Sequence, residues 1–231
     1  MLLLGVDSSS QAATAAVIKD GEILCEYTLN QNKTQSVKML PMIERMLSDV
    51  ELTVRDIDLF ACGVGPGSFT GVRIGVATVR GFAKTLEKGA IPVNALEILA
   101  NNVSNETRVV ALISARENEC YCAVYENNEE VLAPCVKELS EIVEISKEAP
   151  CLLVGDGAIL NADFLKEHLP EARIAQGKCN LISAASLAEV AYKKMQNGKI
   201  GTAEDLIPLY LRKSQAEREY EARNQAEKAR Q

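Results

Sequence analysis

The sequence predicts an α/β protein of two lobes, each with a mixed β-sheet and covering helices. Its 231 residues suit one large or two small domains, and a 47% hydrophobic share is enough to bury a core. Short apolar runs typical of strands alternate with segments of helical periodicity. The order strands, helix, strand, glycine-rich turn and helix occurs in residues 1–106 and again in residues 107–205, as a structural echo without a sequence repeat.

The first half begins as an antiparallel β-meander. Its polar turns are Asp7-Ser8-Ser9-Ser10 and the hairpin signal Asp20-Gly21. Strands are expected at residues 1–6, 12–18, 23–29, 59–64 and, as a short edge strand, 91–93. Helices are expected at residues 34–50, 70–86 and 95–103. Pro41 should lie in or near the first turns of its helix, because further in it would remove a backbone hydrogen bond.

The second half restarts with another meander after a polar break at residues 104–107. Strands are expected at residues 109–113, 119–125, 131–136 and 151–154. Helices are expected at residues 139–146, 158–169 and 184–196. The turn Gly155-Asp156-Gly157 joins the last of these strands to the helix that follows. Residues 206–231 form a C-terminal segment, and its charged tail from residue 212 has almost no apolar face, so we expect it to be frayed.

Composition and charge exclude several classes of protein. The 25 Lys and Arg against 32 Asp and Glu give a net charge of −7, which disfavours binding of nucleic acid by this chain alone. Apolar runs fall far short of the ~20 residues that span a bilayer, and the N-terminus lacks the basic region of a secretion signal, so we expect a cytoplasmic protein. The seven scattered cysteines are expected to be buried free thiols, with Cys120 and Cys122 on one strand face.

The glycine-rich loop at residues 65–71 is the first candidate site. Backbone N–H groups of such a loop at a helix N-terminus attract phosphate. The loop nevertheless matches neither the Gly-x-Gly-x-x-Gly fingerprint nor the P-loop. In the alternative interpretation Gly65 and Gly67 serve the turn, and Gly71, Gly75 and Thr78 form a small-residue face that lets another helix approach closely.

Two polar turns after strands are the second candidate site. They are Asp7 with Ser8, Ser9 and Ser10, and Gly155 with Asp156 and Gly157. In a two-lobed ATPase, turns at these places face each other across a cleft and hold a metal-bound triphosphate. The first turn lacks the glycine that would let the backbone approach a phosphate oxygen. The alternative, that Asp7 and the serines cap local backbone groups, stays open.

Catalytic residues are not identified by the sequence. The single histidine, His168, is expected at a solvated helix end, and neither a metal-ligand pattern nor a nucleophile with its base is present. Arg116 is a candidate anion contact, although a surface ion pair with Glu117 or Glu119 explains it equally simply.

The longest motif resembles a known family. The segments GVGPGSFTGVRIG at residues 63–75, LGVDSS at 4–9, LPMI at 40–43, SAR at 114–116 and PLYLR at 208–212 are similar, in this order, to the TsaB (YeaZ) family. The resemblance covers residues 1–212 and implies an actin-like, Hsp70-like (RNase H-like) fold of the glycoprotease-like group. It further implies a scaffold that binds no cofactor itself and pairs with the paralogue TsaD, which carries the metal and makes threonylcarbamoyladenosine at position 37 of tRNA. The ATPase TsaE would join the same assembly.

The resemblance also assigns partner-binding helices, which match residues 34–50 and 70–86. The candidate contact residues are Met39, Met42, Ile43, Met46, Gly71, Gly75 and Thr78. They would pair with TsaD or with a second copy of the chain, since methionine repacks easily. The alternative is that the methionines fill the protein's own core. The chain departs from the family at Gln35, where a histidine is frequent, and at Ser114, where an aspartate is frequent, and both changes weaken residual metal or catalytic function.

The resemblance therefore implies a non-catalytic partner subunit for threonylcarbamoylation of tRNAs that read codons beginning with A, with tRNA bound only through the complex. The alternative is an autonomous ATPase or kinase that uses Asp7, Ser9 and Asp156 around a magnesium ion. A peptidase would need a nucleophile and a base that the sequence does not offer.

Overall fold

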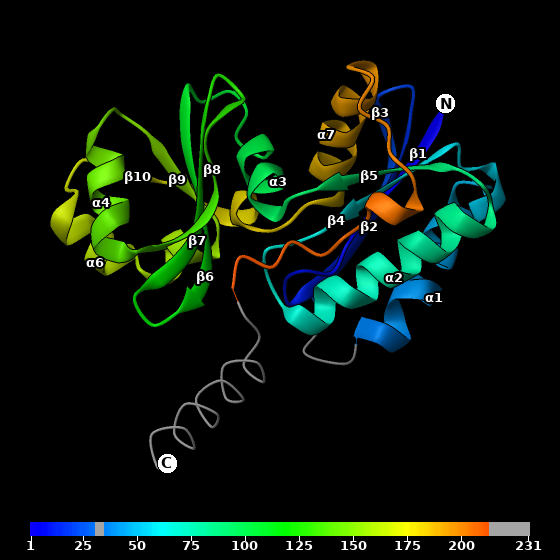
Figure 1. Cartoon of the computed structure of the whole chain (residues 1–231), viewed down its shortest axis with the longest axis horizontal. Coiled ribbons are helices and arrows are strands. Elements are labelled where there is room, and N and C mark those ends of the chain that lie inside the picture. The colour runs from blue at the N-terminus through cyan, green and yellow to red at the C-terminus, as the bar shows by residue number, and fades with distance from the viewer. Residues whose placement is uncertain (31–34, 213–231) are drawn as a thin grey trace, which may run out of the picture.

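The computed structural model describes residues 1–30 and 35–212, and its two lobes are each built on a five-stranded sheet (Figure 1). The first sheet has the order β3-β2-β1-β4-β5. Its strands are β1 Leu2–Asp7, β2 Ala12–Lys19, β3 Glu22–Asn30, β4 Leu59–Gly63 and β5 Gly89–Val93. The second sheet has the order β10-β9-β6-β7-β8. Its strands are β6 Arg108–Arg116, β7 Glu119–Glu126, β8 Glu129–Glu138, β9 Leu152–Val154 and β10 Arg173–Ile174.

The two sheets share one topology. In the first, β1 pairs antiparallel with β2 and parallel with β4. In the second, β6 pairs antiparallel with β7 and parallel with β9. The structural echo expected from the sequence is therefore confirmed at the level of strand order and direction. The sequence analysis missed β10, because two residues are too short to give a period.

Helices cover both sheets. They are α1 Gln35–Asp49, α2 Phe69–Thr85, α3 Ala95–Asn101, α4 Leu139–Lys147, α5 Asp156–Leu160, α6 Ala162–His168 and α7 Ala184–Gln196. The 3-10 helices are Val54–Asp56, Gly177–Asn180 and Ala203–Asp205. Helices α1 and α2 lie on the outer face of the first sheet, α4 to α6 on the outer face of the second, and α3 and α7 between the sheets (Figure 1). Pro41 falls in the second turn of α1.

Alternation along the strands divides the core. Leu3 faces the layer between the sheets, whereas Leu4 faces α1 and α2. In the second lobe, Val109 faces the middle layer and Val110 faces α4 and α6. Successive strand residues point to opposite faces, so both sheets bury apolar side chains on both sides.

The boundary expected between residues 106 and 107 separates the sheets but not the helices. Helix α7, expected in the second lobe, packs on β1, β2 and β5 of the first, while α3, expected in the first, packs on β6 and β7. The two helices also contact each other, and one core cluster runs from Leu3 through α3 and α7 to Val109 and Ala111. The lobes therefore share a core.

The single helix expected at residues 158–169 is wrong. Asn161 ends α5 and precedes α6, with φ −108° and ψ 19°, and its Nδ2 donates to the carbonyl oxygen of Gly157 at 2.8 Å. An asparagine side chain that bonds the nearby backbone competes with the helical ladder, which explains the break. The expected charged tail lies, apart from Arg212, outside the described residues.

Several smaller expectations are confirmed, and one is confirmed only in part. All seven cysteines are free, and Cys120 and Cys122 are buried on one face of β7. The expectation that all seven are buried is wrong, because four are only partly buried: Cys25, Cys135, Cys151 and Cys179. His168 is exposed at the end of α6, stacked on Phe164. Within residues 1–30 and 35–212, each helix is too short or too polar to cross a membrane.

Candidate functional site

The glycine-rich loop is tied to the turn that follows β1. The Ser68 N–H donates to the Ser9 carbonyl oxygen at 2.7 Å, and the Ser8 hydroxyl donates to the Gly71 carbonyl oxygen at 2.7 Å. A Cβ at Gly67 would lie only 2.2 Å from the Ser9 carbonyl oxygen. Glycine is required at residue 67 because the two backbones touch there.

The contact between the glycine-rich loop and the turn after β1 also orients the start of α2. It bears on Gly71 and Gly75, which the sequence analysis gave as candidate partner contacts. Ser68 caps the helix by accepting from the Gly71 N–H at 3.2 Å. Gly71 and Gly75 are buried, and a Cβ at Gly75 would lie 2.8 Å from the Ser8 hydroxyl oxygen. Gly75 therefore lets α2 approach the first turn of its own lobe. Thr78 is half-buried.

Asp7 ends β1 in full burial. Its Oδ1 accepts from the Ser9 N–H at 2.8 Å and from the Ser9 hydroxyl at 3.0 Å, whereas Oδ2 has no hydrogen-bond partner among the described residues. Oδ2 packs on Gly63, where a Cβ would lie 1.8 Å away. Burial raises the pKa of Asp7 from 3.8 to about 6, although the Ser9 hydrogen bonds lower it.

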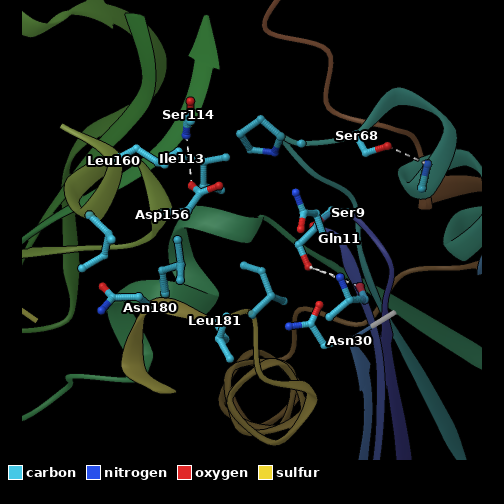
Figure 2. A pocket seen from close by; sticks show the side chains of 18 of the residues that line it. Ser9, Gln11, Asn30, Ser68, Ile113, Ser114, Asp156, Leu160, Asn180 and Leu181 are labelled. Atoms are coloured by element: carbon cyan, nitrogen blue, oxygen red, sulfur yellow. Dashed lines mark hydrogen bonds between the residues drawn. The ribbon is translucent and has the colours of Figure 1, made fainter. Parts of the chain in front are cut away.

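A cleft of about 950 Å³ opens between the lobes (Figure 2). Its first-lobe wall holds polar side chains from the first turn, the end of β3 and the start of α2. They include Ser9, Gln11, Asn30, Ser68 and Thr70. Its second-lobe wall combines polar and apolar side chains. They include Ile113, Ser114, Asp156, Ile159, Leu160, Asn180 and Leu181. In Figure 2 the labelled first-lobe residues Ser9, Gln11, Asn30 and Ser68 lie across the cleft from Ile113, Ser114, Asp156 and Leu160.

Asp156 is the carboxylate of the described cleft wall. It is the first residue of α5 and accepts from the Ser114 N–H at 3.0 Å. Partial burial raises the pKa of Asp156 above its usual value. The hydrogen bond from the Ser114 N–H opposes this change but does not cancel it. Behind it, Asn180 accepts from the Gly155 N–H at 2.8 Å and donates to the Ala175 carbonyl oxygen at 2.7 Å. Asn180, in the 3-10 helix, thus ties the turn after β9 to the residue that follows β10.

The structure brings together only part of the predicted nucleotide site. Ser9 and Asp156 line the same cleft from opposite lobes. Asp7, Ser8, Gly155 and Gly157 are buried behind its walls. Gly155 has φ +108°, and a Cβ there would lie 2.1 Å from the Leu112 carbonyl oxygen, so it serves the turn.

Arg116, the predicted anion contact, is exposed at the end of β6. It lies opposite Glu119 in the strand register, outside the set of described residues that line the cleft. Glu119 itself forms an ion pair with Arg212, at 2.7 Å.

The candidate contact side chains of α1 face inward as well. Met39, Met42, Ile43 and Met46 are 1%, 4%, 2% and 0% exposed and pack in the core under the first sheet. The alternative interpretation, that the methionines fill the protein's own core, is therefore correct. They cannot touch a partner while this core is closed.

The sequence analysis missed three amides of the cleft, Gln11, Asn30 and Asn180. One signal was available: the Asp20-Gly21 hairpin sets a register in which Asn30 lies opposite Ala12, next to the first turn. Asn180 lies in a 3-10 helix far along the chain, and no periodicity marks it.

A C-terminal strap, residues 206–212, runs from one lobe to the other. The Leu209 N–H donates to the Val64 carbonyl oxygen at 2.7 Å. The Tyr210 ring stacks on Phe69 at 4.8 Å between centroids, and Arg73 donates from Nε to the Tyr210 hydroxyl at 2.8 Å. Arg212 then reaches Glu119 on β7. The strap connects the start of α2 with the second sheet.

Two lobes of one topology with a cleft between them define a protein of the actin-like ATPase fold. The chain is similar to YeaZ from Pseudomonas aeruginosa, with a TM-score of 0.76 and 27% identity over 91% of this chain and 99% of that one. Another Pseudomonas aeruginosa structure, described as similar to peptidase YEAZ, gives a TM-score of 0.78 and 28% identity over the same shares. The ROK hexokinase from Thermus thermophilus, at 12% identity and a TM-score of 0.50, shares the fold alone, covering 84% of this chain and 100% of that one.

The family model described as TsaD, tRNA N6-adenosine threonylcarbamoyltransferase, matches residues 22–220. The tRNA threonylcarbamoyladenosine biosynthesis protein TsaB of Escherichia coli is 31% identical over 229 residues, 94% of this chain and 96% of that protein. The protein of the same name from Bacillus subtilis is 28% identical, over 94% and 96%. The chain belongs to the TsaB family.

Proposed function

We propose that this chain is a non-catalytic subunit in the synthesis of threonylcarbamoyladenosine at position 37 of tRNA. It binds and activates a TsaD paralogue, which supplies the metal and the transfer chemistry for tRNAs that read codons beginning with A. The ATPase TsaE joins the same assembly, and tRNA is bound by the complex. The names of the relatives in Escherichia coli and Bacillus subtilis support the pathway.

The burial of Asp7 is the observation that carries the non-catalytic part of the proposal. A magnesium triphosphate in an interlobe cleft needs a carboxylate that reaches the hydrated cation. Asp7 is 0% exposed, its Oδ1 is used by Ser9 and its Oδ2 is pressed on Gly63. The residues present do not fit a cation at this place, so no step of catalysis is assigned to the chain.

The outer faces of α1 and α2 are the proposed partner surface, in place of the inward-facing residues. On α1, Val37 and Leu40 are 69% and 49% exposed and stand beside the exposed Pro41. On α2, Ala77 and Gly81 are exposed one turn apart, and nothing lies within 4 Å of a Cβ built at Gly81. Small and apolar exposed side chains allow a second pair of helices to pack closely.

The decisive experiment is a reconstituted assay of threonylcarbamoyladenosine formation with TsaD, TsaE and the threonylcarbamoyl donor, with and without this chain. We expect formation only when the chain is present. Full activity of TsaD without the chain would contradict the proposal.

The partner surface is tested by light scattering after size-exclusion chromatography of the chain alone and mixed with TsaD. Gly81→Arg should abolish the mixed species, and any homodimer through the same face, because arginine there projects outward. Ser140→Arg, at an exposed position of α4, is the matched control. Gly75→Arg is unsuitable, since its side chain would enter the protein's own core. A mixed species that survives Gly81→Arg would move the interface elsewhere.

The alternative function is an autonomous Mg-ATP enzyme. The position of Ser9 and Asp156 on opposite walls of one cleft favours it. Isothermal titration with Mg-ATP separates the two functions: absence of heat at millimolar nucleotide excludes the alternative, and tight binding with turnover would replace the proposal.

A further inference from the structure

Two cysteine side chains of the second lobe lie directly opposite each other on neighbouring strands. Cys122 on β7 and Cys135 on β8 are partners in the antiparallel register. The Cys135 thiol donates to the Cys122 carbonyl oxygen, at 3.6 Å between sulfur and oxygen. Residues opposite each other in such a pair have Cα atoms about 4.5–5.5 Å apart, inside the range of about 4.4–6.8 Å that a disulfide spans. Their side chains also share one face of the sheet, so the two thiols are within reach of a covalent bond.

The register that brings these cysteines together depends on irregularities in the hairpin. The chain turns through Asn127 and Asn128, which both have positive φ, as in a two-residue hairpin loop. The pairing of β7 with β8 then shifts twice before it reaches Cys122. Without these shifts Ala133, and not Cys135, would lie opposite Cys122. Bulges re-aim the side chains of a strand, and here they place the second thiol against the first.

The neighbouring thiols are placed less well for a bond. Cys120 shares the buried face of β7 with Cys122, but it is opposite Lys137 in the register. Two cysteines at this spacing on one strand stand side by side with Cα atoms about 6.6 Å apart, near the upper limit for a disulfide. Cys151 donates its thiol to the Ser146 carbonyl oxygen at 3.8 Å. The geometry therefore singles out the pair across β7 and β8.

The two paired thiols differ in access from solvent. Cys135 is half-buried on β8, the edge strand of the second sheet, whereas Cys122 is buried in the core of the second lobe. A small oxidant therefore meets Cys135 first, and Cys122 is placed to react with the product. Burial raises the pKa of both thiols, so little thiolate is present at neutral pH and the reaction is slow.

From the register, the thiol contact and the difference in access we propose that Cys122 and Cys135 are a redox-sensitive pair, which a small disulfide of the glutathione type converts to a cross-strand disulfide. The Cys135 thiolate attacks one sulfur of the small disulfide and releases the other half as a thiolate. The Cys122 thiolate then attacks the Cys135 sulfur and releases the second half. The protons of the two cysteines pass to the two released thiolates, so the chain is oxidised by two electrons and the small disulfide is reduced by two. This modification does not rest on the proposed function.

The test is incubation of the full chain with millimolar oxidised glutathione, followed by alkylation and mass spectrometry of its peptides. We expect one linked peptide that contains Cys122 and Cys135, and reversal of the link by dithiothreitol. Because the bond closes a loop in the unfolded chain, the oxidised protein should unfold at a higher urea concentration than the reduced protein. A lasting glutathione adduct on Cys135, a link between other cysteines, no reaction overnight, or a lower urea midpoint after oxidation would overturn the proposal.

Three variants separate the roles of the two thiols. Cys122→Ala should leave Cys135 as a lasting mixed disulfide with glutathione, because the thiol that resolves it is gone. Cys135→Ala should prevent the disulfide and leave Cys122 unmodified, since Cys122 is buried. Cys151→Ala, at another half-buried cysteine of the same lobe, is the matched control and should form the link as fast as wild type. Thermal unfolding of the reduced variants checks that each is folded. Modification of Cys122 in Cys135→Ala at the wild-type rate would overturn the order of reaction and with it the proposal.

Discussion

Asp7 is a fully buried carboxyl with one oxygen unpaired, and such a group is costly to ionise. Its pKa of about 6 in the folded protein compares with 3.8 in the unfolded chain. The folded protein therefore binds this proton more tightly, and ionisation at neutral pH lowers stability. The difference between the two pKa values corresponds to a loss of folding stability of about 3 kcal/mol. This loss is complete above pH ~7, and it disappears as the pH falls through about 6 toward 3.8.

Asp7→Asn removes this ionisation and leaves an oxygen to accept from Ser9. We expect the free energy of unfolding of the variant, relative to wild type, to increase by about 2 kcal/mol between pH 4 and pH 7.5, because at pH 4 more than half of the unfolded chains already carry an ionised Asp7. Urea unfolding at a series of pH values measures it. The test compares the change in stability between two pH values. Any effect of the Asp7→Asn amide that does not depend on pH therefore drops out of the comparison.

Asp56→Asn is the control of opposite sign. The Thr53 hydroxyl and N–H hold the pKa of Asp56 below its usual value, so its contribution to stability is present at neutral pH and is lost as the pH falls. Relative to wild type, Asp56→Asn should become less stable as the pH rises. If the difference in free energy of unfolding between Asp7→Asn and wild type did not change with pH, Asp7 would not be buried in solution.

At the scale of elements, the strap at residues 206–212 contributes to the stability of the start of α2. The Tyr210 ring stacks on Phe69, and the Arg73 guanidinium lies near both rings. The Leu209 N–H donates to the Val64 carbonyl oxygen just before the glycine-rich loop. The loop in turn contacts the first turn through Ser68 and Ser9. One short segment thus orders the helix that forms part of the proposed partner surface.

Tyr210→Ala removes the aromatic stack and the hydrogen bond from Arg73. We expect a loss of about 1–2 kcal/mol in the free energy of unfolding and faster amide exchange in the first turn of α2. Tyr210→Phe keeps the stack and should cost less than about 1 kcal/mol. Equal losses in the two variants would show that ring stacking contributes nothing.

Elements with a strong local signal could be predicted from the sequence. The Asp20-Gly21 hairpin, the capped start of α2 and the period of α7 each depend on residues close together in the chain. The placement of α3 and α7 on the sheet of the opposite lobe could not be predicted from the sequence. The period of a helix shows that the helix has an apolar face, but it does not show which sheet covers that face. For the same reason the methionines of α1 and Gly75 indicated close packing without telling whether the neighbour is the same chain.

At the scale of the whole molecule, α3 and α7 join the two lobes through one continuous core. Opening the cleft widely would expose apolar surface of this layer, and such exposure costs about 25 cal/mol per Å². We infer that the lobes move little and that the cleft keeps its shape. A fixed cleft with an acidic wall suits a scaffold better than an enzyme that must close on a triphosphate.

The charge of the whole chain leads to a last prediction, about tRNA. The chain has a net charge of −7, so its contact with tRNA phosphates would bring like charges together and release few counterions from the tRNA. We expect the chain alone to bind tRNA with a dissociation constant above about 100 μM at physiological salt, and the complex with TsaD to bind far more tightly. Filter binding at two salt concentrations measures both. Tight binding by the chain alone, falling steeply with salt, would reveal a phosphate-binding face and contradict the view that tRNA is held only through the complex.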